Sequence, residues 1–150
     1  MIYLLRHGQA EPHNHDDAGR QLTAKGERQS QAAGQALASL GAHVDACLTS
    51  PKVRAADTAR LACRGLGLEP ELTDELSGGG FDSLGLAAGR GDVLLVGHEP
   101  DLSDEIARLT SARVKLRKGG LAIVDRGTLL ALLRPEDLAA GRRAPTAHGR

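Results

Sequence analysis

Two histidines in the sequence each follow a short apolar run that is typical of a buried strand. Arg6 and His7 come directly after the run at residues 2–5, and His98 lies two residues after the run at residues 92–96. Ligands of open α/β sheets bind beyond the carboxyl ends of the strands. We therefore expect Arg6, His7 and His98 to meet at one edge of a sheet.

A second arginine is expected to reach the same edge from a helix. A further apolar run at residues 44–49 is followed by Ser50-Pro51, which opens a predicted helix with Arg54 in its first turn. Two arginines can hold a dianionic phosphoryl group with paired N–H donors. The helix N-termini beside Ser50-Pro51 and Pro100 are expected to add unpaired backbone donors. Together these donors predict a phosphoryl group as the ligand.

The two histidines suit covalent phosphoryl transfer. Nearby positive charge lowers the pKa of an imidazole, so we expect His7 to be neutral, with a lone pair that can attack phosphorus. His98 can donate a hydrogen bond to a phosphoryl oxygen in the transition state. Gly8 allows a sharp turn and close approach of the substrate. We expect no metal or other cofactor, because arginine and histidine supply the charge that Mg²⁺ would otherwise bring.

The remainder of the chain predicts the elements that position these residues. Hydrophobic periodicity, capping residues and turn residues indicate helices at 23–40, 51–64, 81–88 and 100–110, strands at 2–5, 44–49, 92–96, 121–125 and 128–133, and a mixed segment at 68–76. Alternating strands and helices predict a three-layer α/β/α sandwich around a mostly parallel sheet. We expect one domain over residues 1–140 and a disordered tail at 141–150.

Composition argues against several classes of function. Nineteen basic and nineteen acidic residues give a net charge of zero, so no global field attracts nucleic acid or a membrane. Tyr3 and Phe81 are the only aromatic residues, too few for a base-stacking surface. No apolar run approaches the roughly 18 residues of a membrane span. We expect a cytoplasmic monomer or weak dimer in which Cys47 and Cys63 are reduced and structural.

The three candidate segments together resemble the histidine phosphatase superfamily, also called the phosphoglycerate mutase-like family. Leu5-Arg6-His7-Gly8 is similar to its signature, residues 49–59 to its second block, and Gly97-His98 to its third. The resemblance covers essentially the whole chain. It implies a phosphatase in which His7 is phosphorylated during turnover.

Within that family, the chain most resembles the small SixA-type phosphohistidine phosphatases. Its length, the stretch from Asp16 to Gly26 and the turn at residues 97–102 carry this resemblance. The segment at 68–92 is too short for the helical cap of larger relatives, so we expect an open site that admits a phosphorylated side chain of another protein. A small-molecule phosphatase, acting on a sugar or nucleotide-derived phosphate, and a non-catalytic module that binds phosphoproteins are the alternatives.

The resemblance also implies a carboxylate acid between the second and third motifs. Glu75 is the best candidate, with Glu99 and Glu11 behind it, and a plain surface carboxylate is the alternative. Imidazole leaves phosphorus more readily than an alkoxide, so a phosphohistidine substrate depends less on this acid. Gly8 and Glu99 are further expected to contact the substrate.

Residues 9–21 are predicted to form a polar loop. Arg20 lines the phosphate site, as the resemblance suggests, or pairs with Asp16 or Asp17. His13 and His15 together with these two aspartates could imitate a metal cluster, but they lack the usual ligand spacing, so we expect no metal there.

A local basic run precedes the strand predicted at residues 121–125. It contains Lys115, Arg117 and Lys118. We interpret it as a solvated turn, with contact to an acidic protein partner as the alternative.

Overall fold

The structure is a computed structural model that describes residues 1–12 and 16–140 of the 150. Within these residues, six strands form one sheet. The strands are β1 (Ile2–Arg6), β2 (Ala46–Thr49), β3 (Pro70–Leu72), β4 (Val93–Gly97), β5 (Leu121–Asp125) and β6 (Thr128–Leu133). The helices are α1 (Ala24–Ser39), α2 (Val53–Arg64), α3 (Ser83–Ala87), α4 (Asp101–Thr110) and α5 (Pro135–Ala140), with a short 3-10 helix η1 (Asp74–Leu76).

The sheet has the strand order β3-β2-β4-β1-β5-β6. β1, β2, β3 and β4 run parallel, whereas β5 is antiparallel to both β1 and β6. Arg6 pairs with Gly97, and Thr49 pairs with Val96. The carboxyl ends of β2, β4 and β1 therefore lie next to one another at one edge. The predicted mostly parallel sheet is confirmed, and it brings the three candidate segments together.

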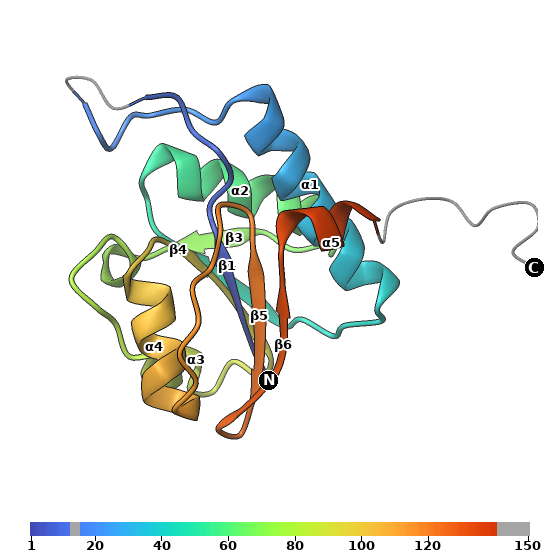
Figure 1. Cartoon of the computed structure of the whole chain (residues 1–150), viewed down its shortest axis with the longest axis vertical. Coiled ribbons are helices and arrows are strands. Elements are labelled where there is room, and N and C mark those ends of the chain that lie inside the picture. The colour runs from blue at the N-terminus through green and yellow to red at the C-terminus, as the bar shows by residue number, and fades with distance from the viewer. Residues whose placement is uncertain (13–15, 141–150) are drawn as a thin grey trace, which may run out of the picture.

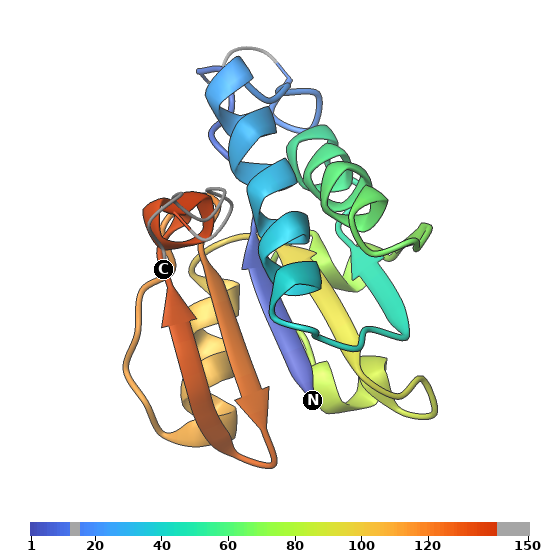
Figure 2. The ribbon, with the colours of Figure 1, turned by 90° about the vertical axis from the view of Figure 1, so that its right-hand side faces the viewer.

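Helices cover both faces of the sheet, as Figures 1 and 2 show. On β1, Tyr3 and Leu5 point into a core with α1, α2 and Leu138 of α5, whereas Ile2 and Leu4 point into a second core with α4. β4 alternates in the same way. Strands buried on both faces read as continuous apolar runs, which is why β1 and β4 were visible in the sequence. The predicted three-layer sandwich is confirmed.

The segment between β3 and β4 contains only η1, α3 and loops, so no cap subdomain covers the sheet edge. The mixed segment at residues 68–76 resolves into β3 and η1. α2 begins at Val53, later than predicted, because Lys52 is still extended with φ −59° and ψ 136°. α5 was not predicted.

Some predictions lie outside the described residues. They concern His13, His15 and the tail at 141–150. Within the described part of the chain, no helix is long and apolar enough to cross a membrane. Cys47 and Cys63 are free thiols buried in the core beside α1 and α2.

Candidate active site

His7 lies directly after β1 and is 6% exposed. Its backbone N–H donates to the Gly97 carbonyl at 3.1 Å, which ties it to the end of β4. On its ring, Nδ1 lies 2.7 Å from the Gly8 carbonyl oxygen. Because a carbonyl oxygen only accepts, Nδ1 must carry the ring proton. In the neutral ring, Nε2 therefore holds the lone pair.

Gly8 is clamped by a buried threonine of α2. Its backbone N–H donates to Thr58 Oγ1 at 3.0 Å, and the Thr58 hydroxyl donates to the Arg54 carbonyl at 2.7 Å. Ser30 Oγ on α1 lies 3.1 Å from Thr58 Oγ1 and 2.8 Å from the Gly26 carbonyl, so its single proton serves one of these two. Thr58 and Ser30 are both 0% exposed.

Sequence reasoning did not single out Thr58 or Ser30. The available signal for Thr58 was its spacing, four residues after Arg54, which places both side chains on one helical face.

Gly8 also permits close contact with α1, because a Cβ on Gly8 would lie 2.5 Å from the Gly26 carbonyl oxygen. The turn after β1 therefore packs directly onto the first turn of α1.

The two arginines are each held by a distant backbone carbonyl. Arg6 Nη1 donates to the Leu116 carbonyl at 2.9 Å. Arg54 Nη1 donates to the Asp17 carbonyl at 2.8 Å, and its Nη2 lies 3.3 Å from Asp17 Oδ2. The Nε atoms of both guanidinium groups are buried and have no hydrogen-bond partner among the described residues. Each arginine is thus fixed in place with its buried Nε donor unused.

His98 follows β4 and faces His7, with the ring centroids 5.2 Å apart. Its Nε2 lies 2.9 Å from Ser50 Oγ, which accepts from the Lys52 backbone N–H at 3.2 Å. When the Ser50 hydroxyl donates its proton to Nε2, the proton of the neutral ring sits on Nδ1. This Nδ1 is buried and has no partner in the part of the chain that the structure describes.

Both rings are neutral at physiological pH. Burial, followed by the neighbouring His98, Arg54 and Arg6, lowers the pKa of His7 to about 3, although the hydrogen bond to Gly8 opposes this. Burial, Arg54 and Lys52 lower the pKa of His98 to about 4. Desolvation disfavours the charged imidazolium, and neighbouring cations repel it. The expected neutral histidine beside two arginines is thus present.

The helix N-termini contribute less than expected. The Val53 N–H at the start of α2 donates to the Ala18 carbonyl at 2.9 Å. At α4, the N–H groups of Leu102 and Ser103 donate to the His98 carbonyl and to Glu99 Oε1. The prediction that both helix starts supply unpaired donors is wrong for these three groups, because nearby protein acceptors already use them.

Glu99 is occupied by protein donors. Its Oε1 accepts from the Ser103 N–H at 2.7 Å, and its Oε2 accepts from the Ser103 hydroxyl and, at 3.1 Å, from the Leu116 N–H. Glu99 therefore ties α4 to Leu116, whose carbonyl binds Arg6. Its predicted contact with substrate stays a prediction.

The two remaining predicted site residues with charged side chains are Glu75 and Arg20. Glu75 in η1 is exposed, and its backbone N–H donates to Thr73 Oγ1 at 3.4 Å. Arg20 pairs with Asp17 Oδ1 at 3.3 Å and donates from Nε to the Glu11 carbonyl. Because Asp17 also contacts Arg54, Arg20 belongs to the network behind the site, in line with the pairing alternative.

The site therefore combines a neutral imidazole lone pair with three unused buried nitrogen atoms. These are Arg6 Nε, Arg54 Nε and His98 Nδ1. Leaving a buried donor unpaired costs roughly 1–3 kcal/mol. Donors left unpaired around a nucleophile are suited to bind an oxyanion, and a phosphoryl group offers several acceptor oxygens.

Comparison with known proteins identifies the family of the chain. Residues 2–84 match the family described as histidine phosphatase superfamily (branch 1). An uncharacterized protein of a Picosynechococcus strain is 35% identical over 136 residues, covering 80% of this chain and 81% of that protein.

Two solved structures have the same fold. A candidate phosphohistidine phosphatase SixA from Agrobacterium tumefaciens superposes with a TM-score of 0.79 at 24% identity, covering 89% of this chain and 97% of that one. The protein histidine phosphatase SixA in complex with tungstate gives a TM-score of 0.78 at 23% identity, covering 91% and 98%. Since the family match alone spans more than half of the sequence, the chain belongs to the histidine phosphatase superfamily, a membership that supports phosphatase activity on a phosphorylated substrate.

Proposed function

We propose that the protein hydrolyses phosphohistidine on other proteins through a phosphorylated His7. The observation that carries this proposal is the state of the His7 ring. Its Nδ1 proton is directed to the Gly8 carbonyl, its pKa is lowered to about 3, and its Nε2 keeps a lone pair beside unused arginine donors. A neutral imidazole fixed in one orientation is what a nucleophile at phosphorus requires.

In the first step, His7 Nε2 attacks phosphorus, and the bond from phosphorus to the substrate breaks. Arg6 Nε, Arg54 Nε and His98 Nδ1 donate to the phosphoryl oxygens as negative charge builds on them. The leaving group, an imidazole of the substrate protein, takes up a proton. Because the arginines are held by backbone carbonyls, they need little reorganisation during this step.

In the second step, water attacks the phosphorus of the phosphorylated His7. The bond to Nε2 breaks, orthophosphate leaves, and the neutral imidazole is regenerated. Glu75 is proposed to carry protons for the leaving group and for this water, and Gly8, Arg20 and Glu99 to support substrate binding. Glu75 would have to turn inward to do so, since it is exposed in this structure.

The proposed substrate follows from access and leaving-group chemistry. Only η1, α3 and loops separate β3 from β4, so a side chain carried on a protein surface can approach. An imidazole leaves more readily than an alkoxide, so its departure needs less help from an acid. The solved SixA structure with tungstate, an oxyanion of the same shape as phosphate, has this fold and supports an oxyanion site.

The decisive experiment compares three substrate classes: a phosphohistidine protein, an aryl phosphate and several sugar phosphates. We expect wild type to prefer the phosphohistidine protein, and His7→Ala to lower kcat by at least about a thousandfold. His43→Ala is the matched control, because His43 is exposed and pairs with Asp45 just before β2. Quenched turnover mixtures of wild type should contain an acid-labile phosphoryl group that His7→Ala lacks.

Full activity in His7→Ala would refute the covalent mechanism. Preference for a sugar phosphate would leave the nucleophile standing but replace the substrate class. The role of Glu75 is tested separately: Glu75→Gln should slow the sugar phosphates more than the phosphohistidine protein, because their alkoxide leaving groups need the proton more. An equal effect on the sugar phosphates and the phosphohistidine protein would remove Glu75 from the mechanism.

A further inference from the structure

A groove of about 720 Å³ opens beside the site, and its lining is strongly basic. Six cationic side chains line it: Arg6, Lys25, Arg28, Lys115, Arg117 and Lys118. Among the described residues of this lining, Glu136 is the one carboxylate, and Arg117 binds it at 3.0 Å. Since the whole chain has equal numbers of basic and acidic residues, this excess of positive charge is local.

Four of these cations have no evident structural task. Lys25, Arg28, Lys115 and Lys118 are exposed, and none forms an ion pair with a residue that the structure describes. Their mutual repulsion is unfavourable for folding, if weakly so in water. A cluster of unpaired cations around a concave surface raises the local concentration of anions.

The groove is joined to the backbone of the nucleophile on two sides. The N–H of Gly119 donates to the His7 carbonyl at 2.9 Å, so Lys118 lies one residue from that contact. Lys25 lies in the first turn of α1, and a Cβ on Gly8 would be 2.5 Å from a carbonyl oxygen in that turn. Arg6 itself lines the groove. The groove therefore borders the loop that carries His7, and it shares Arg6 with the site.

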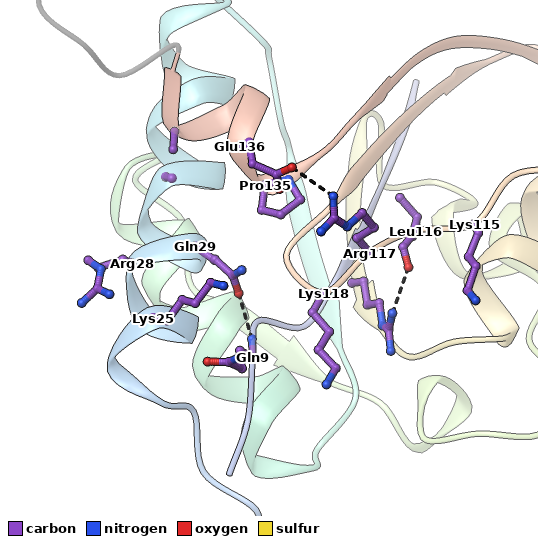
Figure 3. A pocket seen from close by; sticks show the side chains of 13 residues that line it. Gln9, Lys25, Arg28, Gln29, Lys115, Leu116, Arg117, Lys118, Pro135 and Glu136 are labelled. Carbon is purple, nitrogen blue, oxygen red and sulfur yellow. Dashed lines mark hydrogen bonds and ion pairs between the residues drawn. The ribbon is translucent and has the colours of Figure 1, made fainter. Parts of the chain in front are cut away.

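The cations are spread out and do not converge on one point. In Figure 3, Arg28 and Lys115 lie at opposite ends of the groove, with Lys25 and Lys118 between them. They come from α1 and from the segment before β5. A site for a single second phosphate needs donors that meet at one position. Dispersed, exposed charges instead complement an extended acidic surface, and they act chiefly on encounter rate and specificity.

Resting on the function proposed above, we propose that this groove binds acidic side chains that surround the phosphohistidine of the substrate protein. Consecutive Cα atoms are 3.8 Å apart, and residues one helical turn apart have Cβ atoms about 5–6 Å apart. Carboxylates within one turn of the phosphohistidine would then face Lys25 and Lys118, the two cations whose chain neighbours contact His7 and Gly8.

The test uses two phosphohistidine peptides of equal length, one with Asp and Glu flanks and one with Asn and Gln flanks. For wild type at low salt, we expect kcat/KM to be about tenfold higher for the acidic peptide, and NaCl to erase the difference. K25E/K118E should lose about this tenfold on the acidic peptide and change less than about twofold on the neutral peptide. Arg126→Glu is the control, since Arg126 is exposed in the β5–β6 turn at the opposite end of the sheet.

Equal losses on both peptides, or no loss on either, would overturn the proposal. So would a K25E/K118E variant that spares the acidic peptide but loses activity on a sugar bisphosphate, because the groove would then hold a second phosphate. Binding of the unphosphorylated acidic peptide, measured by fluorescence anisotropy, keeps this test independent of turnover. Tight binding that K25E/K118E weakens, without hydrolysis of either phosphopeptide, would uphold the groove and reject phosphohistidine as the substrate.

Discussion

The neutrality of His7 and His98 has a measurable consequence for the pH dependence of stability. Burial and nearby cations lower the pKa values of these rings to about 3 and about 4 in the folded protein. In the unfolded chain, both return to the ordinary histidine value of about 6.5. As the pH falls below 6.5, the unfolded chain binds protons that the folded chain does not. The free energy of unfolding must therefore decrease with falling pH.

The magnitude follows from linkage. Each pH unit in this window costs about 1.4 kcal/mol per histidine. At pH 5, about 1.5 units below the unfolded value, each ring contributes a loss of about 2 kcal/mol, and the pair about 4 kcal/mol. Domains of this kind are stable by roughly 5–15 kcal/mol, so the loss is a large fraction of the total. The contribution is fully present above pH 6.5 and is lost progressively toward pH 4 and 3.

Urea denaturation of wild type and of a His7→Asn/His98→Gln variant at pH 8, 7, 6 and 5 measures this effect. The asparagine retains a donor for the Gly8 carbonyl, and the glutamine retains a polar group for Ser50. The other histidines are common to both proteins, so they cancel in the difference. Wild type should lose about 4 kcal/mol more than the variant between pH 8 and 5. Parallel curves, or an NMR titration of His7 near pH 6.5, would refute the neutral-nucleophile argument.

Three further substitutions test the framework of the site. Thr58→Val leaves the buried Gly8 N–H without its acceptor, so the free energy of unfolding should fall by about 1–3 kcal/mol and kcat should fall as well. Thr58→Ser should retain both values, and unchanged stability in Thr58→Val would contradict the proposed contact. Glu99→Gln replaces one carboxylate oxygen that accepts from the Ser103 and Leu116 N–H groups, and should destabilise by about 1–3 kcal/mol without altering the ratio of phosphohistidine to sugar phosphate turnover. Selective loss of the sugar phosphate would make Glu99 the acid. Gly34→Ala places a Cβ on α1 2.2 Å from a backbone oxygen of α2, so the free energy of unfolding measured in urea should fall by about 1–3 kcal/mol. An unchanged free energy would show that α1 and α2 are not packed this closely.

Much of the fold could be predicted from short-range pattern. β1 and β4 are buried on both faces and read as unbroken apolar runs. α1 has a Thr23 cap, ends at Ser39 and is soon followed by Gly41 with φ +70°. α5 escaped prediction because six residues are too short to show a helical stripe. α2 begins later than predicted because the backbone of Lys52 is extended, and no residue pattern around Lys52 predicts this conformation.

The sequence by itself determined which side chains are available for chemistry. The runs before His7 and His98, and the segment that carries Arg54, place them after parallel strands, whose carboxyl ends share one edge. This inference needs only the period of the strands and the direction of the chain, which are local properties. The inference gives the types of residue that meet at the edge, and these types indicate the class of reaction.

Only the tertiary structure decided which atoms of those side chains are free. Arg6 is anchored by a carbonyl 110 residues away and Arg54 by one 37 residues away, which leaves their Nε atoms unused. The Thr58 clamp on Gly8 spans 50 residues. The depressed pKa values of the histidines likewise arise from burial by several elements together. Hydrogen bonding and desolvation depend on which distant segments pack together, and no local pattern encodes that packing.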